Sequence, residues 1–429
     1  MNEKHINLKI VLALLVVIAL AGCTSGSPAA SPTPVASPRL IPSGTHALVP
    51  TVTPSPTFPT PTSNATSTQQ SIIEQHVVAI ETMQTSDFSA AGKLVLIGGD
   101  HLGYLLDLQT LERNLLPVAI GGIPLVGGGV DGSPEIVSPN RQWLAYIEQI
   151  NGSSEEQLHI MGTDGKLLPI HQPMGWNNLI GWLDNEHLTF TKKDHPDGTV
   201  IVYNPFTDDT QVISPSFPAI FPSGYFVTWS GWYAADSPFV IYDPTITRVA
   251  YIRHQDQLFI HTLWDAESNE ILWKMDCYSS GYRPSWSPDG EYIAVSLSPL
   301  RSTQEGATYI LDHNGYEIRT FDTISGAPAW SPNGLRLSGF WADLETCAPD
   351  FIHTGPAIFD MSAGTIDVYC LGSSLLAITP QIWSPDGRWI AINSEYQDTF
   401  RIILLDLIEN KAFEITRDAT VIGWMVGTP

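Results

Sequence analysis

Three ten-residue stretches in the C-terminal part of the chain are near copies of one another, and they decide the fold. They read Trp286-Ser-Pro-Asp-Gly-Glu-Tyr-Ile-Ala-Val295, Trp330-Ser-Pro-Asn-Gly-Leu-Arg-Leu-Ser-Gly339 and Trp383-Ser-Pro-Asp-Gly-Arg-Trp-Ile-Ala-Ile392. In each copy the Ser-Pro-Asp/Asn-Gly sequence predicts a tight turn, because Pro presets φ, Asp or Asn bonds the local backbone, and Gly accepts a positive φ. The residues before the turn and the apolar run after it are therefore expected to form two antiparallel strands.

Weaker copies extend this repeat along the chain. The anchoring positions of all copies are Val137, Trp182, Tyr242, Trp286, Trp330, Trp383 and Trp424. The intervals between them are 45, 60, 44, 44, 53 and 41 residues. A period of about 40–50 residues made of short strands is typical of a β-propeller blade. We expect the anchoring tryptophans to pack against neighbouring blades rather than to bind a ligand.

The two ends of the repeat region complement each other. Residues 93–98, 104–108 and 113–117 predict three strands without a convincing inner strand before them, and residues 419–426 predict an inner strand with none after it. Pairing the two ends in one blade removes both free edges. The sequence therefore predicts a single all-β propeller over 86–429 with seven four-stranded blades. Six or eight blades are the alternatives, because residues 88–92 resemble a degenerate turn that would give the first blade its own inner strand.

The repeat resembles that of the TolB-type propellers, a WD-like class with Trp-Ser-Pro-Asp-Gly repeats. The resemblance covers roughly residues 86–426 and is strongest at the copies that begin at Trp286, Trp330 and Trp383. It implies a closed ring of blades and, usually, a binding role. It carries no universal catalytic residues, so we transfer the fold and no site.

The first 23 residues predict a targeting segment. Lys4 and Lys9 precede an unbroken apolar run over 10–20, which is too short to span a bilayer as a mature helix. Leu-Ala-Gly-Cys23 then resembles the lipobox of bacterial lipoproteins, which implies cleavage before Cys23 and lipidation of its thiol. An ordinary secretory signal is the alternative. We expect an extracytoplasmic protein that is anchored through Cys23 to the cell membrane or the outer membrane.

A tether and a short connecting segment follow. Residues 24–70 contain 10 Pro, 10 Thr and 8 Ser, which favours a disordered stalk. Residues 71–85 are expected to lead into the propeller as a short helix or a strand. Ser71 to Glu74 resembles a helix capping box, and a strand over 76–80 is the alternative.

Two long intervals contain the candidate binding residues. An insertion at about 215–237 contains Trp229, Trp232 and Tyr233, and a second one at about 342–355 adds Trp341, Asp343 and Asp350 around its ends. Aromatic residues in a Gly/Ser-rich loop suit stacking on sugars or contacts with a protein partner. Strand alternation places both insertions on the same face of the propeller. The alternative is that these aromatic residues pack under their own loops.

The remaining cysteines suggest one disulfide. Cys347 follows the second strand of its predicted blade and Cys370 ends the fourth, so both are expected at the same face. We predict a Cys347–Cys370 disulfide in an oxidising compartment, with Cys277 free or paired with another chain. The sequence has no Cys-x-x-Cys and no Cys/His cluster with zinc spacing, so we predict no metal site.

Composition narrows the function further. The chain has 44 Asp and Glu against 20 Lys and Arg, a net charge of −24, which argues against nucleic-acid binding. The sequence has no serine-hydrolase motif and no nucleotide-binding motif in the strand–helix context that such a motif requires, so no cofactor is expected. We expect a monomeric, non-catalytic binding module for a protein or a cell-envelope glycan. The alternative is an extracellular hydrolase or lyase acting on a glycan or lactone, with carboxylates at the central channel.

Overall fold

In the computed structural model, the described residues all belong to the unit that spans residues 66–429. They are 72–82, 92–100, 102–117, 136–149, 156–170, 178–191, 200–213, 240–244, 248–253, 257–262, 271–275, 284–296, 307–321, 324–341, 355–371, 379–396 and 399–427. The regular elements in these ranges are all β-strands. The described residues contain no helix that is long and apolar enough to cross a membrane. The predicted all-β class is confirmed.

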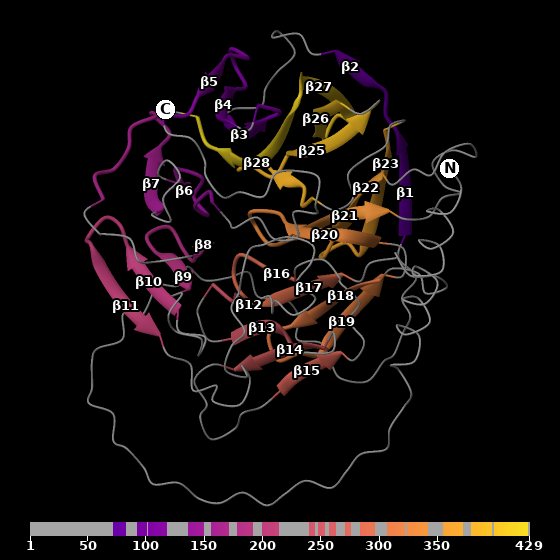
Figure 1. The fold of residues 1–429 in the computed structure, drawn as a ribbon. Coiled ribbons are helices and arrows are strands. Elements are labelled where there is room, and N and C mark those ends of the chain that lie inside the picture. Colours follow the sequence, from indigo (N-terminus) through magenta and orange to yellow (C-terminus); the bar gives the residue numbers. More distant parts are fainter. Residues whose placement is uncertain are drawn as a thin grey trace, which may run out of the picture. The chain divides into compact units, whose positions relative to one another are not determined.

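The described strands form seven sheets (Figure 1). The N-terminal half contributes β3 (Lys93–Gly98), β4 (Gly103–Asp107) and β5 (Arg113–Leu115); β6 (Trp143–Gln149) and β7 (Glu156–Gly162); and β8 (Asn178–Trp182), β9 (Leu188–Thr191), β10 (Val200–Asn204) and β11 (Asp209–Ile213). The middle contributes β12 (Val240–Tyr242), β13 (Arg248–Arg253), β14 (Gln257–Thr262) and β15 (Ile271–Met275); and β16 (Ser285–Trp286), β17 (Tyr292–Ser296), β18 (Thr308–Asp312) and β19 (Glu317–Phe321). The C-terminal part contributes β20 (Ile324–Trp330), β21 (Arg336–Trp341), β22 (Gly355–Asp360) and β23 (Thr365–Cys370); β24 (Ile382–Trp383), β25 (Trp389–Tyr396), β26 (Thr399–Asp406) and β27 (Lys411–Arg417); and β28 (Ala419–Met425).

Consecutive strands within a sheet pair antiparallel, and hydrophobic clusters join successive sheets. One cluster joins β6 and β7 to the β8–β11 sheet, and another joins the β16–β19 sheet to the β20–β23 sheet. The β20–β23 sheet packs in turn on β24–β27, which packs on β28, β3 and β4, and these pack on β6 and β7. Figure 1 shows the sheets following one another in chain order around a common centre. This arrangement is that of a β-propeller.

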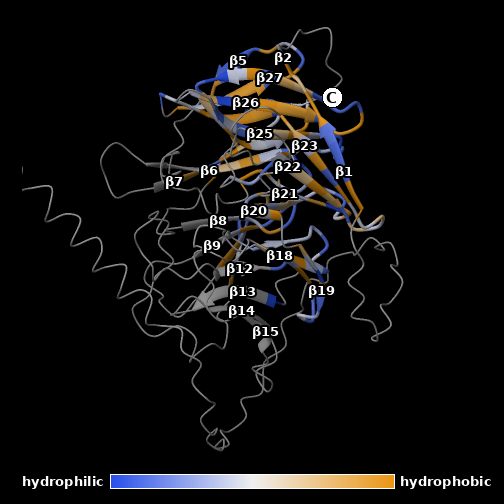
Figure 2. Cartoon of the chain, turned by 90° about the vertical axis from the view of Figure 1, so that its right-hand side faces the viewer, coloured by the Kyte–Doolittle hydropathy of each residue, from blue (hydrophilic) through white to orange (hydrophobic). Residues whose placement is uncertain are grey.

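A sheet that packs between two neighbouring sheets needs apolar runs in its strands. Leu94 and Leu96 of β3 face the β24–β27 sheet, whereas Val95 and Ile97 face β6 and β7. Because successive side chains of a strand point to opposite faces, a strand that is covered on both faces needs apolar side chains on both. Figure 2 shows the same character in β26, which is largely hydrophobic.

The predicted closure of the ring is confirmed. The C-terminal strand β28 pairs antiparallel with β3, with Ala419 opposite Gly98 and Met425 opposite Lys93. The resulting sheet has the order β28-β3-β4-β5, so the last strand of the chain is the inner strand of the first sheet. A one-residue bulge at Ile422 interrupts the pairing between Val421 and Gly423.

The anchoring tryptophans link neighbouring sheets, as predicted from the repeat. The indole N–H groups of Trp182, Trp330 and Trp383 donate to the carbonyls of Ile136, Ser285 and Ala329, at 3.0, 2.8 and 3.0 Å. Each acceptor directly precedes the anchoring position of the preceding sheet. The five anchoring tryptophans are 0–8% exposed. Their role in packing is confirmed, and each of these hydrogen bonds contributes about 0.5–1.5 kcal/mol.

The repeated turns are held by a recurring set of hydrogen bonds. The hydroxyl of Ser287 donates to Asp289 at 2.6 Å and accepts the N–H of Tyr292 at 2.9 Å. Where the repeat is degenerate, the carboxylate of Asp243 takes the place of the serine and accepts the N–H of Arg248 at 2.6 Å. This contact ties Asp243 to the start of β13 in a copy that lacks the Ser-Pro-Asp-Gly sequence.

The turn glycines serve both conformation and packing between turns. Gly290 and Gly334 have φ of 73° and 70°, in the region that side chains disfavour. A Cβ on Gly290 would lie 3.3 Å from Cδ of Pro244, and one on Gly334 would lie 3.7 Å from Cδ of Pro288. The glycine of each turn therefore lies against the proline of the preceding turn.

Candidate functional site

Most of the residues that the sequence singled out for binding lie outside the described residues. This applies to Trp229, Trp232 and Tyr233 of the first insertion and to Asp343 and Asp350 of the second. The described strands do show where the insertions attach. The first leads into the start of the inner strand β12, and the second leaves after Trp341, which pairs with Ile324 at the start of the inner strand β20. Both insertions thus attach at corresponding ends of their sheets.

The prediction that Trp341 contributes to a binding surface is wrong. Trp341 is the last residue of β21, is 3% exposed, and belongs to the cluster between the β16–β19 and β20–β23 sheets. Its ring packs with Ile324 and Phe359 in that cluster. Burial against these apolar side chains leaves no face of the ring for a ligand.

Of the four cysteines, Cys370 alone lies among the described residues. Cys370 ends β23, is 6% exposed, and is disulfide-bonded. Cys347, Cys277 and Cys23 lie outside the described residues. The Cys347–Cys370 pairing and the lipidation of Cys23 therefore stay predictions.

The N-terminal part of the described chain forms two strands instead of the helix that the capping box favoured. β1 (Ile72–Val77) pairs in parallel with β23, and β2 (Ile80–Thr82) pairs in parallel with β27. We refer to residues 72–82 as the strap. It adds a fifth strand to the outer edge of two consecutive sheets (Figure 1). A short helix is displaced because both outer edges offer unpaired backbone groups that strands can satisfy.

The strap is fixed where it crosses from one sheet to the next. The N–H of Val78 donates to the carbonyl of Cys370 at 3.1 Å. Its side chain is 5% exposed and packs in the cluster with Tyr369, Leu371 and Ala412. The strap is therefore attached by backbone pairing on both sides of one buried apolar contact.

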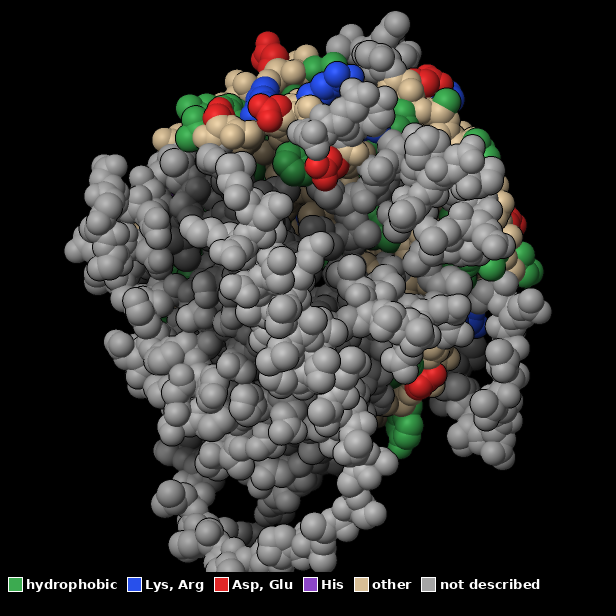
Figure 3. Space-filling model, turned by 45° about the vertical axis from the view of Figure 1, so that its right-hand side comes forward, with side chains coloured by type: hydrophobic (Ala, Val, Ile, Leu, Met, Phe, Trp, Pro, Cys, Tyr) green, Lys and Arg blue, Asp and Glu red, His purple; other side chains and the backbone are tan. Residues whose placement is uncertain are grey.

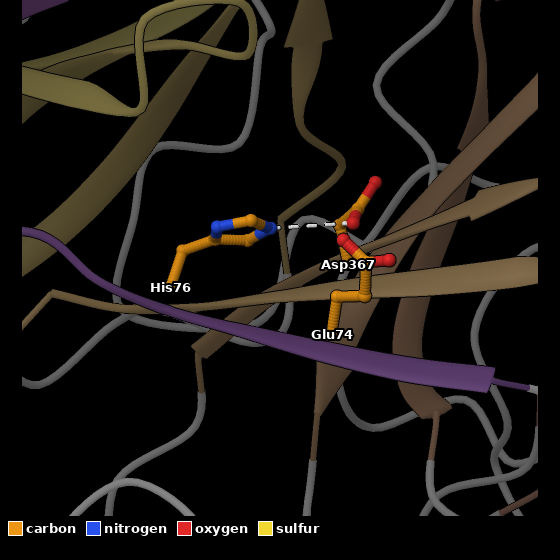
Figure 4. A group of neighbouring side chains, drawn as sticks. All are labelled: Glu74, His76 and Asp367. Carbon is orange, nitrogen blue, oxygen red and sulfur yellow. Dashed lines mark hydrogen bonds and ion pairs between the residues drawn. The ribbon is translucent and has the colours of Figure 1, made fainter.

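Three potential metal ligands meet on one face of the strap and its partner strand (Figure 4). Glu74 and His76 are two residues apart on β1 and share a face, and Glu74 is the direct register partner of Asp367 on β23. One oxygen of each carboxylate and one nitrogen of the imidazole lie within 4.8 Å of one another. Nε2 of His76 is 3.3 Å from Oδ1 of Asp367.

The surroundings hold the imidazole in place. His76 is the register partner of Tyr369, and the two rings stack with centroids 4.9 Å apart and an interplanar angle of 24°. Burial raises the pKa of Tyr369, and the negative charges of Asp367, Asp406 and Glu74 raise it further, while Arg336 acts in the opposite sense. The tyrosine stays neutral, and the field at this position is predominantly negative.

Other described carboxylates serve structure. Burial acts to raise the pKa of Asp406, but hydrogen bonds from Arg388 and from two main-chain N–H groups outweigh it and lower the pKa. Burial likewise opposes the pKa lowering of Glu414 by Arg417 and Arg401. On the described surface in Figure 3, acidic and basic side chains lie side by side. Wherever contacts shift a carboxylate pKa among the described residues, the shift is downward.

Comparison with known proteins adds fold neighbours. No family model and no curated protein match the sequence. The chain is similar to TolB from Acinetobacter baumannii, with 14% identity over 81% of this chain and 86% of that one and a TM-score of 0.37. It is also similar to a protein described as a 6-phosphogluconolactonase from Bacteroides fragilis, with 14% identity over 80% and 97% of the chains and a TM-score of 0.44. An oligogalacturonate lyase in complex with manganese gives 15% identity, coverage of 77% and 89%, and a TM-score of 0.45. These likenesses transfer no site and no activity.

The sequence reasoning missed the group formed by Glu74, His76 and Asp367. The i, i+2 spacing of Glu74 and His76 is visible in the sequence, but it brings side chains together only in a strand, and the capping box favours a helix. Asp367 lies 291 residues from His76, just before Cys370 in the predicted fourth strand of a blade. The missing signal was the pairing of the strap with β23, which no local pattern encodes.

Proposed function

We propose that this chain is a lipid-anchored, extracytoplasmic β-propeller that acts as a non-catalytic binding module. A lipid on Cys23 holds it at a bacterial membrane, and residues 24–70 form a stalk that lifts a monomeric propeller off the surface. The face with the two insertions recognises a protein or a cell-envelope glycan through Trp229, Trp232 and Tyr233. No cofactor takes part.

The observation that carries a binding role is the state of the described carboxylates. Ion pairs and turn hydrogen bonds lower the pKa of each one that is shifted, for example Asp406 beside Arg388 and Glu414 beside Arg401. A carboxylic acid that protonates a leaving group needs a raised pKa. The acidic residues described here stabilise turns and sheet edges, which supports a scaffold that presents loops for recognition.

We further propose seven blades. Six of the seven described sheets have four or five strands, and the seventh consists of β6 and β7. Isolated bridges flank this pair, with Val137 opposite Leu144 on one side and Met161 opposite Leu167 on the other. The bridges occupy the places of an inner and an outer strand, which supports a full blade there.

Binding is tested with variants of the first insertion. Purified envelope glycans and solubilised envelope proteins are presented to the immobilised full chain, to a Trp229→Ala/Trp232→Ala variant, and to Tyr316→Ala as a matched control. Tyr316 is 70% exposed in a turn far along the chain from the insertion. Binding that falls at least about tenfold in the double variant and persists in the control supports the proposal. Equal binding by all three contradicts the role of the aromatic loop, and turnover of a glycan or lactone would favour the hydrolase or lyase instead.

Anchoring is tested separately. Incorporation of labelled fatty acid and membrane fractionation are compared for the full chain and its Cys23→Ser variant. Lipidation predicts label and membrane association that both disappear in the variant. A variant that stays membrane-bound, or a parent chain that takes up no label, contradicts the lipid anchor without bearing on the binding face.

A further inference from the structure

We propose that Glu74, His76 and Asp367 bind a divalent transition-metal ion that fastens the strap to β23. The proposal concerns a site that is separate from the insertions, and it does not rest on the binding function above. It makes the attachment of the N-terminal segment to the propeller dependent on metal.

The donor set suits such an ion. One imidazole nitrogen and two carboxylate oxygens are ligands that zinc accepts, at bond lengths of about 2.0–2.2 Å. Ligand atoms around a tetrahedral ion at these bond lengths are separated by about 3–4 Å. The three atoms of this group already lie within 4.8 Å of one another, so small side-chain rotations are enough to close the site. Water would complete the coordination on the exposed side.

The backbone holds the ligands together before any ion binds. The parallel register places Glu74 directly opposite Asp367, and the ring of His76 is held by its stack on Tyr369. Figure 4 shows the three side chains converging from the two strands. Pre-positioned ligands lose little conformational freedom on binding, which favours affinity.

Charge also favours a cation at this place. Like charges directly opposite on paired strands destabilise a sheet. Among the described residues, the ion-pair contact of Asp367 is with His76, and Glu74 has no Lys or Arg within ion-pair distance. A divalent ion between the two carboxylates would convert their repulsion into attraction.

The ligand types also predict selectivity. Imidazole is a good ligand for zinc, copper, nickel and iron, whereas calcium and magnesium prefer sets of oxygen ligands. Zinc is therefore the appropriate probe, with calcium and magnesium as comparisons. Because the ion would bridge residues 291 positions apart, it would act as a clip on the strap.

The test uses the full, tag-free chain after removal of metal, titrated calorimetrically with zinc. His76→Ala and Asp367→Asn are compared with the control variant His313→Ala. This control removes a similar histidine–carboxylate pair at a turn, in which Nδ1 of His313 lies 2.8 Å from Oε2 of Glu291. We expect His76→Ala and Asp367→Asn to weaken one zinc site by more than about tenfold, the lower limit for loss of outer-shell partners alone. His313→Ala should leave that site unchanged.

Hydrogen exchange provides a second readout that is independent of folding defects. Zinc should slow exchange of the backbone amides over 72–77 in the parent chain and in His313→Ala, but not in His76→Ala. Circular dichroism confirms that each variant is folded. The proposal is overturned if the parent chain binds no zinc, if His76→Ala binds it as tightly, or if calcium or magnesium binds equally well.

Discussion

Replacing Asn393 is expected to open the ring at its closure. Asn393 lies on β25, is 3% exposed, and reaches the main chain of the closing strand β28. Its amide nitrogen donates to the carbonyl of Val421 at 3.1 Å, and its amide oxygen accepts the N–H of Val421 at 2.7 Å. An inner strand has no neighbour on its free edge, so this one side chain satisfies both backbone groups.

The cost follows from what the substitution leaves behind. Asn393→Ala would leave the N–H and C=O of Val421 without these partners beside a bulge, and Val421 is 2% exposed. Each buried group without a partner costs about 1–3 kcal/mol, so the variant should lose about 2–6 kcal/mol. The 3.5 Å contact between Asn393 and Thr379 adds little to this sum.

Urea unfolding and hydrogen exchange measure the two parts of the prediction. The free energy of unfolding should fall by the stated amount, and exchange should accelerate first over β28 and β3. Thr308→Val is the matched control, because buried Thr308 donates to the carbonyl of Ile324 at 2.8 Å between two sheets away from the closure. Its exchange change should be confined to β17, β18 and β20, because the hydroxyl of Thr308 also lies 2.6 Å from that of Ser296.

Two results would refute this reasoning. The first is a loss of stability in Asn393→Ala no larger than that in Asn314→Ala, whose side chain is exposed in a turn. The second is a large loss of stability with unchanged exchange over β28, which would place the effect of Asn393 elsewhere than at the closure.

Three further perturbations test the turns and the links between sheets by urea unfolding. Trp383→Phe removes an indole donor to Ala329 and Ser338, whereas the buried Nε1 of Trp341 has no hydrogen-bond partner among the described residues. Trp383→Phe should therefore cost about 1–2 kcal/mol more than Trp341→Phe, and equal costs would contradict the linking role. Gly334 has a φ of 70°, so Gly334→Ala should lower the free energy of unfolding by about 1–2 kcal/mol. Gly427→Ala should lower it by less than about 0.5 kcal/mol, and the reverse order would count against the turn argument. The pKa of Asp406 is lowered in the folded chain, so the stability that its carboxylate contributes is present above the ordinary value of 3.8 and is lost as pH falls through the folded pKa. Asp406→Asn should therefore cost about 1.5–3 kcal/mol at pH 7, and its difference from the parent chain should shrink below pH 3.8. A difference that does not change with pH would refute the ion pair as its source.

The strands next to the repeated turns were predictable because their signals are local. The predicted antiparallel strands before and after each Ser-Pro-Asp/Asn-Gly turn agree with the pairs β16/β17 and β24/β25, and the predicted tail strand over 419–426 agrees with β28 to one residue. The closure was predictable for a related reason, since one end of the repeat lacked an inner strand and the other had a strand to spare. Both inferences need only turn chemistry and the rule that sheet edges are paired.

The role of Trp341 was also encoded but was misinterpreted. Trp341 stands eleven residues after Trp330, at the end of the apolar run that follows the turn and is predicted to form the second strand of that blade. The repeat thus assigned Trp341 to a strand, but its proximity to the second insertion suggested an exposed role. Position within the repeat was the better guide, because the strand that ends at Trp341 is covered on both faces.

The strap could not be predicted in the same way. Its strand β1 is exposed at five of six residues, so it has no alternation of apolar and polar side chains to reveal a strand. Its stability comes from backbone pairing with β23 and β27, whose paired residues lie 293 and 332 positions further along the chain, as for Ile72 with Thr365 and Ile80 with Ala412. The capping box therefore favoured a helix, with a strand over 76–80 as the alternative, and the pairing with two distant strands decided for strands.

The strap and the closure lie on opposite edges of adjoining sheets. β2 pairs with β27 on the outer edge of the β24–β27 sheet, whereas Asn393 of the same sheet holds β28 at the inner side. Any load that reaches the propeller through the chain before Ile72 therefore meets the backbone pairs of β1 and β2 first, and it does not act directly on β28. Because these contacts share no residue, the fold can retain a closed ring while its attachment to the N-terminal segment is strengthened or released. A metal clip at Glu74, His76 and Asp367 would regulate that attachment and leave the ring closed.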